Sequence, residues 1–167
     1  MKRIMIALDY SNTSLKVAET GFELAKIMNA EICLVHAIPD ISYYSTEYSP
    51  LAGLEDFSPA DSFKTMAEQE SEARMFLTAV AKHLGDKYIK IKVVEGAYYE
   101  TLLEYASEYD ADLIVMGSRG QHGLDRLIMG DIVSKVIQHA QTRVLIVPAD
   151  KTYLQQIISR ANANQHV

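Results

Sequence analysis

Apolar residues along this chain alternate between two patterns. Short apolar runs of strand length occur at residues 4–8, 32–38, 113–116 and 144–147, and at residues 89–93 apolar residues alternate with lysines, as in a strand near a sheet edge. Between them, apolar residues recur at spacings of three and four over residues 15–28, 61–84, 102–109 and 132–139, which is the stripe of an amphipathic helix. Ser11 or Asn12 is expected to cap the first helix, and Gly85 to end the second. The order predicts one doubly wound α/β domain, with a five-stranded parallel sheet, helices on both faces and right-handed crossovers.

Two segments lack these patterns. Residues 40–60 exceed the usual length of a connection and contain Tyr43, Tyr44 and Tyr48. These features favour one of two roles for the loop: a lid that covers a bound ligand, or a surface that contacts a partner. Residues 151–167 carry a short apolar helical face and then a polar end. We therefore divide the chain into a domain at residues 1–150 and a tail with a short helix at residues 151–167.

Composition narrows the function. The 167 residues carry a net charge of −6, which argues against non-specific binding to nucleic acid or to an anionic membrane. No apolar run reaches the length of a membrane span, and the first run is expected to be a strand rather than a signal peptide. The single cysteine, Cys33, lies in an apolar run and is expected in the core, as is His36. These features predict a cytoplasmic protein, and the histidines show no metal-ligand spacing.

The richest segment follows the fourth apolar run. Residues 116–136 read MGSRGQHGLDRLIMGDIVSKV, so glycines crowd a strand-to-helix connection where backbone N–H groups can approach a phosphate. Ligands of open α/β sheets bind beyond the carboxyl ends of the strands. Asp9, Tyr10 and Ser11 follow the first strand, and Ala37 ends the second. A nucleotide crevice is therefore expected at this edge.

This segment resembles the nucleotide loop of the universal stress protein family, whose ATP-binding members carry G-x2-G-x9-G followed by Ser or Thr. Gly117, Gly120 and Gly130 hold that spacing, but the next residue is Asp131. The resemblance covers about residues 2–148 and implies a Rossmann-like fold, similar to the adenine nucleotide alpha hydrolases.

The resemblance also implies a role for each residue of the crevice. Asp9 would lie near the base and ribose, with the main chain of Ala37 on the base and Met116 on its other side. Tyr10 would narrow the entrance or stack on the base, although Asp9 has the alternative of capping the next turn. The other residues implied to line the site are Ser11, Gly117, Arg119, Gly120, Gly130, Asp131 and Ile132, the last four around the phosphates.

Asp131 is the departure that matters for phosphate binding. A carboxylate at a helix N-terminus is a good cap, but it repels a phosphate about 4 Å away by on the order of 4 kcal/mol at an effective dielectric near 20. A divalent cation between the two would reverse the sign. The substitution therefore weakens triphosphate binding, makes it depend on Mg²⁺, or favours a nucleotide whose phosphates do not reach Asp131.

The resemblance implies a non-catalytic regulatory protein of the stress response that binds ATP, ADP or AMP, with or without Mg²⁺, and forms a homodimer through the fifth strand. One alternative is a member of the same fold that binds no nucleotide and acts through protein–protein contacts. Another is a weak Mg-dependent ATPase or self-phosphorylating enzyme.

Overall fold

The computed structural model describes residues 2–39, 65–118 and 131–148. Several expectations fall elsewhere: the loop at 40–60, the tail at 151–167 and the site residues Arg119, Gly120 and Gly130 lie outside the described residues.

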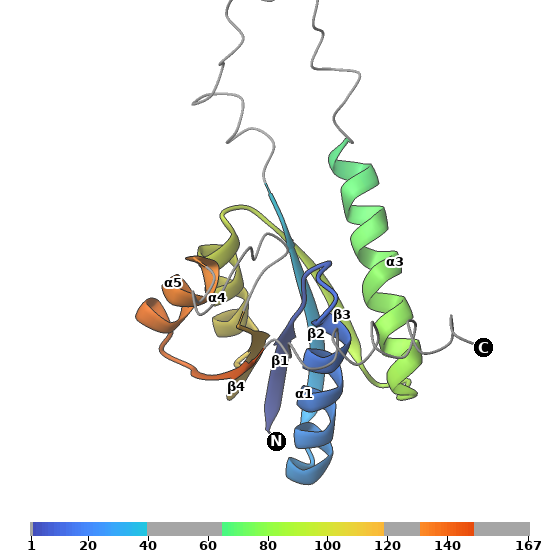
Figure 1. Ribbon diagram of the computed structural model, residues 1–167, viewed down its shortest axis with the longest axis vertical. Helices are drawn as coiled ribbons and strands as arrows, with labels where there is room; N and C mark the ends of the chain where they lie inside the picture. The colour runs from blue at the N-terminus through green and yellow to red at the C-terminus, as the bar shows by residue number, and fades with distance from the viewer. Residues whose placement is uncertain (1, 40–64, 119–130, 149–167) are drawn as a thin grey trace, which may run out of the picture.

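One parallel sheet forms the centre of the molecule (Figure 1). Its strand order is β3-β2-β1-β4-β5, and every adjacent pair is parallel, as predicted. The strands are β1 (Arg3–Ala7), β2 (Glu31–Ile38), β3 (Lys90–Glu95), β4 (Leu113–Gly117) and β5 (Arg143–Val147). Because β1, β2 and β4 are buried on both faces, their apolar runs are nearly continuous.

Helices cover both faces of the sheet, which confirms the doubly wound prediction. The helices are α1 (Ser14–Met28), α3 (Met66–Leu84), α4 (Tyr98–Glu108) and α5 (Asp131–His139). Ile4 and Ile6 of β1 point to one core with α1 and α3, whereas Met5 points to a second core with α4 and α5. Successive side chains of a strand point to opposite faces of the sheet, so β1 contributes to the core on each face.

Glycine 21 sets how closely α1 approaches the sheet. A methyl group at Gly21 would lie 2.6 Å from the Cδ1 atom of Ile6. The helix therefore packs directly on β1, and this fixes the start of α1 beside the carboxyl end of that strand.

Two helix starts differ from the predictions. The second predicted helix begins at Met66 rather than near residue 61, because Thr65 and Glu68 form a reciprocal capping box. The first helix has Thr13 at its N-cap without a side-chain cap, so neither Ser11 nor Asn12 occupies that position. Gly85 ends α3 with φ of 76°, as predicted.

Candidate functional site

The strand order reverses between β1 and β4, so the carboxyl ends of β1, β2 and β4 mark the place where open α/β sheets bind ligands. Ala7, near the end of β1, pairs with Val35 of β2 on one side and with Met116 of β4 on the other. Ala37 and Met116 belong to the core on the α4 and α5 face, together with Ala7. Ala37 lies two residues beyond Val35 on β2, so the predicted base-binding residues Ala37 and Met116 belong to the same edge of the sheet.

Asp9 lies at the centre of this edge, in the turn that joins β1 to α1. Its Oδ1 atom accepts hydrogen bonds from the backbone N–H of Ser11, at 3.1 Å, and from the Ser11 hydroxyl. The Ser14 hydroxyl donates to the Asp9 main-chain carbonyl oxygen and lies 2.8 Å from Oδ1. The turn-capping role is thus confirmed for Oδ1, while Asp9 Oδ2 has no hydrogen-bond partner among the described residues.

Ser14 is a site residue that the sequence analysis missed. Its side chain is only 4% exposed and is one of two buried polar residues in the described part of the chain, the other being His36. The signal was the run of hydroxyl residues after Asp9, since Ser11, Thr13 and Ser14 all contribute to the same hydrogen-bonded turn. The cluster holds the Asp9 carboxylate in one orientation.

Tyr10 contributes its ring to an aromatic group next to this edge. The ring centroid of Tyr10 lies 4.4 Å from that of His36 and 5.0 Å from that of Phe76, which belongs to α3. Tyr10 is still 42% exposed. Stacking of Tyr10 on a base stays a prediction, and Phe76 was not anticipated because it lies far away in the sequence.

His36 is a buried strand residue, as predicted, with its Nδ1 atom 2.7 Å from the carbonyl oxygen of Leu8. Burial lowers the pKa of His36, while the bond to Leu8 and the charge of Asp9 act in the opposite direction. In the neutral ring, an Nδ1–H group donates to Leu8 and ties the end of β1 to β2. This bond holds the Asp9 turn beside Ala37.

Asp131 lies in the first turn of α5 as the structure describes that helix, Asp131–His139. Its side chain is 81% exposed, and its Oδ2 atom lies 3.1 Å from Nζ of Lys135 one turn further along the helix. Asp131 raises the pKa of Lys135, first through the hydrogen bond that it accepts from the ammonium group and then through its charge. Ile132, the next predicted phosphate-site residue, packs partly buried against the α4 and α5 core.

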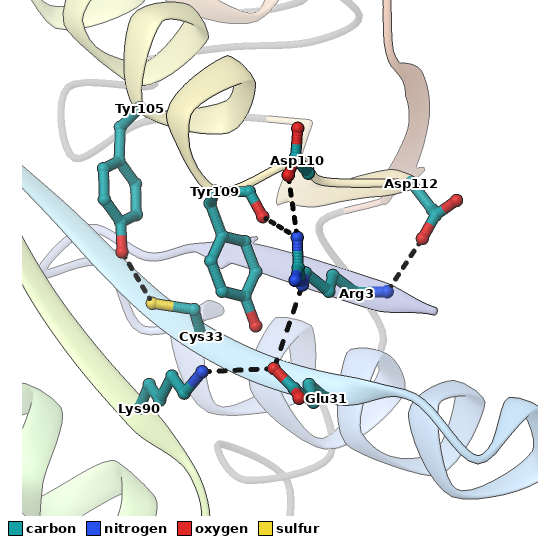
Figure 2. Close-up of polar contacts among 8 residues, drawn as sticks. All are labelled: Arg3, Glu31, Cys33, Lys90, Tyr105, Tyr109, Asp110 and Asp112. Atoms are coloured by element: carbon teal, nitrogen blue, oxygen red, sulfur yellow. Dashed lines mark hydrogen bonds and ion pairs between the residues drawn. The ribbon is translucent and has the colours of Figure 1, made fainter. Parts of the chain in front are cut away.

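A second polar cluster occupies the opposite, amino edge of the sheet (Figure 2). Arg3 lies 2.9 Å from Oδ2 of Asp110 and donates to the main-chain oxygen of Tyr109, while the Arg3 N–H donates to Asp112. These bonds join the start of β1 to the turn between α4 and β4. The cluster is a structural clamp that lies away from the candidate ligand edge.

Cys33 is a core residue, as predicted, beneath that clamp. Its side chain is fully buried, with Sγ 3.5 Å from the Tyr105 hydroxyl (Figure 2). Burial raises the pKa of the Cys33 thiol and also raises the pKa of Tyr109 to about 12. Burial thus favours the protonated form of both the Cys33 thiol and the Tyr109 hydroxyl.

Two features are missing from the part of the chain that the structure describes. In that part of the chain, no group of three or more His, Cys, Asp or Glu side chains is arranged to hold a metal ion. The helices described there include none that is long and apolar enough to cross a membrane.

The fold and the position of the candidate site are those of a Rossmann-like α/β protein. The chain matches the Universal stress protein family over residues 1–148. It is 31% identical to universal stress protein MJ0531 of Methanocaldococcus jannaschii over 155 residues, which span 90% of this chain and 84% of that protein. The chain therefore belongs to the universal stress protein family.

Solved structures give the same picture of the fold. The structure of a universal stress protein in complex with cAMP has a TM-score of 0.59 and 25% identity, and covers 87% of this chain and 96% of its own. The structure of MJ0577 of Methanocaldococcus jannaschii has a TM-score of 0.69 and 24% identity, and the match covers 90% of this chain and 97% of the MJ0577 chain.

Proposed function

We propose that this protein is a regulatory member of its family that binds an adenine nucleotide at the carboxyl edge of β1, β2 and β4. The observation that carries the proposal is the state of Asp9. Its turn fixes one carboxylate oxygen and leaves the other without a partner among the described residues. A fixed acceptor at the reversal of strand order is suited to a donor on a ligand, such as a ribose hydroxyl or the adenine amino group.

The other residues of the edge complement a nucleoside. The main chain at Ala37 is level with the Asp9 turn and supplies peptide groups for the base, and Met116 with Gly117 supplies an apolar wall. Phosphates would extend toward the start of α5, near Asp131 and Ile132, where the helix dipole favours negative charge. The proposed lining is completed by five further residues: Tyr10, Ser11, Arg119, Gly120 and Gly130.

The solved relative in complex with cAMP supports the choice of an adenine nucleotide, at 25% identity over nearly its whole chain. ATP, ADP and AMP remain the candidate ligands, with or without Mg²⁺. Asp131 at the phosphate end supports the alternative of a member that acts through protein contacts alone, since a carboxylate there opposes phosphate.

Calorimetric titration of the full chain with adenosine, AMP, ADP, ATP and guanosine, each with and without Mg²⁺, tests the proposal. We expect adenosine to bind and guanosine to bind at least about tenfold more weakly, because the edge would read the base. Absence of heat with all adenine compounds would favour the alternative. Release of phosphate from Mg-ATP during the titration would indicate a weak ATPase.

Asp9→Asn is the sharpest variant for this titration. One amide oxygen can still accept from Ser11 and Ser14, so the turn keeps its hydrogen bonds, while the free acceptor becomes an NH₂ donor. Adenosine affinity should fall at least about tenfold. Asp86→Asn is the matched control, because Asp86 also accepts a turn hydrogen bond, from the N–H of Tyr88, away from the ligand edge.

We also propose that the chain forms a homodimer through β5. This strand pairs only with β4 among the described strands, and its apolar residues Val144, Leu145 and Ile146 are partly exposed. An open apolar edge is an association site that proteins usually cover. Light scattering at micromolar concentration that gave the mass of a single chain would reject this assembly.

A further inference from the structure

The charged pair at the start of α5 bears directly on which ligands the site accepts. We propose that Lys135 determines phosphate specificity, because its ammonium group neutralises Asp131 and so lets a nucleotide phosphate approach the helix start without a divalent cation. The inference rests on the proposed function and concerns the phosphate end of that same site.

Two contacts from two different helices hold Lys135 in place. Its Nζ atom lies 3.1 Å from Oδ2 of Asp131 on α5 and 5.5 Å from the centroid of the Tyr99 ring on α4. Tyr99 is itself fixed, because its hydroxyl donates to Glu100 at 2.8 Å and its ring lies 5.4 Å from that of His139. Lys135 thus has an ion-pair partner on its own helix and an aromatic neighbour on α4, while its side chain stays 46% exposed.

The second step concerns what a phosphate would meet at this helix start. A lone carboxylate repels it, whereas a carboxylate with an ammonium group at 3.1 Å presents almost no net charge. The helix dipole then acts on the phosphate unopposed. Asp131 alone suggested that ATP binding requires metal; the pair of Asp131 and Lys135 instead predicts that ATP binds without it.

Glu100 is a second acidic residue whose charge acts on Lys135. Its carboxylate is engaged by the Tyr99 hydroxyl, and both Tyr99 and Glu100 raise the pKa of Lys135 only after the larger effect of Asp131. Asp131 is thus the principal partner of Lys135. The ammonium group therefore neutralises the carboxylate that stands where ATP-binding family members carry Ser or Thr.

Calorimetric titration of Lys135→Gln with ATP, Mg-ATP and adenosine tests the inference. Metal-free ATP should bind at least about tenfold more weakly than to the native chain, because the Asp131 charge is uncovered. Adenosine affinity should stay within about twofold, since it carries no phosphate, and Mg²⁺ should restore most of the lost ATP affinity. The double variant Asp131→Asn with Lys135→Gln removes both charges, so ATP affinity should return to within about threefold of the native value.

Arg74→Gln is the matched control. Arg74 forms an ion pair of the same spacing with Glu70 on α3, at 2.9 Å, and this helix packs on the opposite face of the sheet from α4 and α5. This variant should leave all three affinities unchanged, and circular dichroism should show native helix content in every variant.

The outcomes separate this inference from the proposed function. If the native chain binds neither adenosine nor ATP, the proposed function fails and this inference fails with it. If the native chain binds adenosine and Lys135→Gln leaves the ratio of ATP to adenosine affinity unchanged, only the role of Lys135 is wrong. An equal loss for adenosine and ATP would likewise overturn it, because that result shows a structural rather than an electrostatic effect.

Discussion

Ser14→Ala tests whether the Asp9 turn serves stability, ligand binding or both. The Ser14 hydroxyl is buried and contacts both the main-chain oxygen and the carboxylate of Asp9. A hydrogen bond to a charged group contributes about 1.5–3 kcal/mol, but Asp9 Oδ1 keeps two bonds from Ser11. Alanine returns about 0.5 kcal/mol through its higher helix propensity. The free energy of unfolding should therefore fall by about 1.5 kcal/mol.

The same variant should weaken adenosine binding by roughly threefold to tenfold, because a carboxylate free to rotate loses part of its preorganisation. Urea unfolding followed by circular dichroism gives the stability, and calorimetric titration gives the affinity. Thr20→Ala is the control on the same helix, since its hydroxyl donates only to the Lys16 carbonyl oxygen, at 2.7 Å. Lower stability with native affinity would refute the view that this turn orients Asp9 for a ligand.

Three further predictions concern other groups. Asp131→Ser should tighten metal-free ATP binding by about tenfold, or 1.4 kcal/mol, and leave adenosine unchanged; calorimetry showing no change for either ligand would make Asp131 a helix-end residue only. Since burial lowers the folded-state pKa of His36 below its usual 6.5, the unfolded chain binds more protons under acid conditions, so stability should fall as pH drops through 6.5. Urea midpoints from pH 8 to 5 should show this decline, and His36→Gln should reduce its slope. The buried Cys33 thiol, with its raised pKa, should resist a thiol reagent in the native protein and react in urea, and rapid native labelling would contradict its burial.

The fold was predictable because burial in a parallel sheet leaves a direct pattern in the sequence. The apolar runs of β1, β2 and β4 are continuous where both faces are covered, and the lysines that alternate along β3 mark it as an edge. The predicted start of α3 was wrong, because the spacing of apolar residues does not show which residue caps the helix. The capping box of Thr65 and Glu68 is, however, visible as Thr-x-x-Glu.

The site was predictable only as far as it depends on topology. Asp9, Ala37 and Met116 meet because carboxyl ends of adjacent parallel strands meet. The contact of Tyr10 with Phe76 depends on how α3 packs against the sheet, which no local pattern specifies. Lys135 was overlooked although its spacing of four from Asp131 is a known helical pair.

The two edges of the sheet are chemically unlike, and this limits how copies of the chain can join. The β3 edge carries the exposed charges of Lys90, Lys92 and Glu95, which discourage another strand from pairing there. The β5 edge has an apolar centre with one charge, Arg143, at its beginning. A fibre needs two receptive edges on every subunit, so if two copies join through β5 as proposed, the charged β3 edges would leave a closed pair that cannot grow into a fibre.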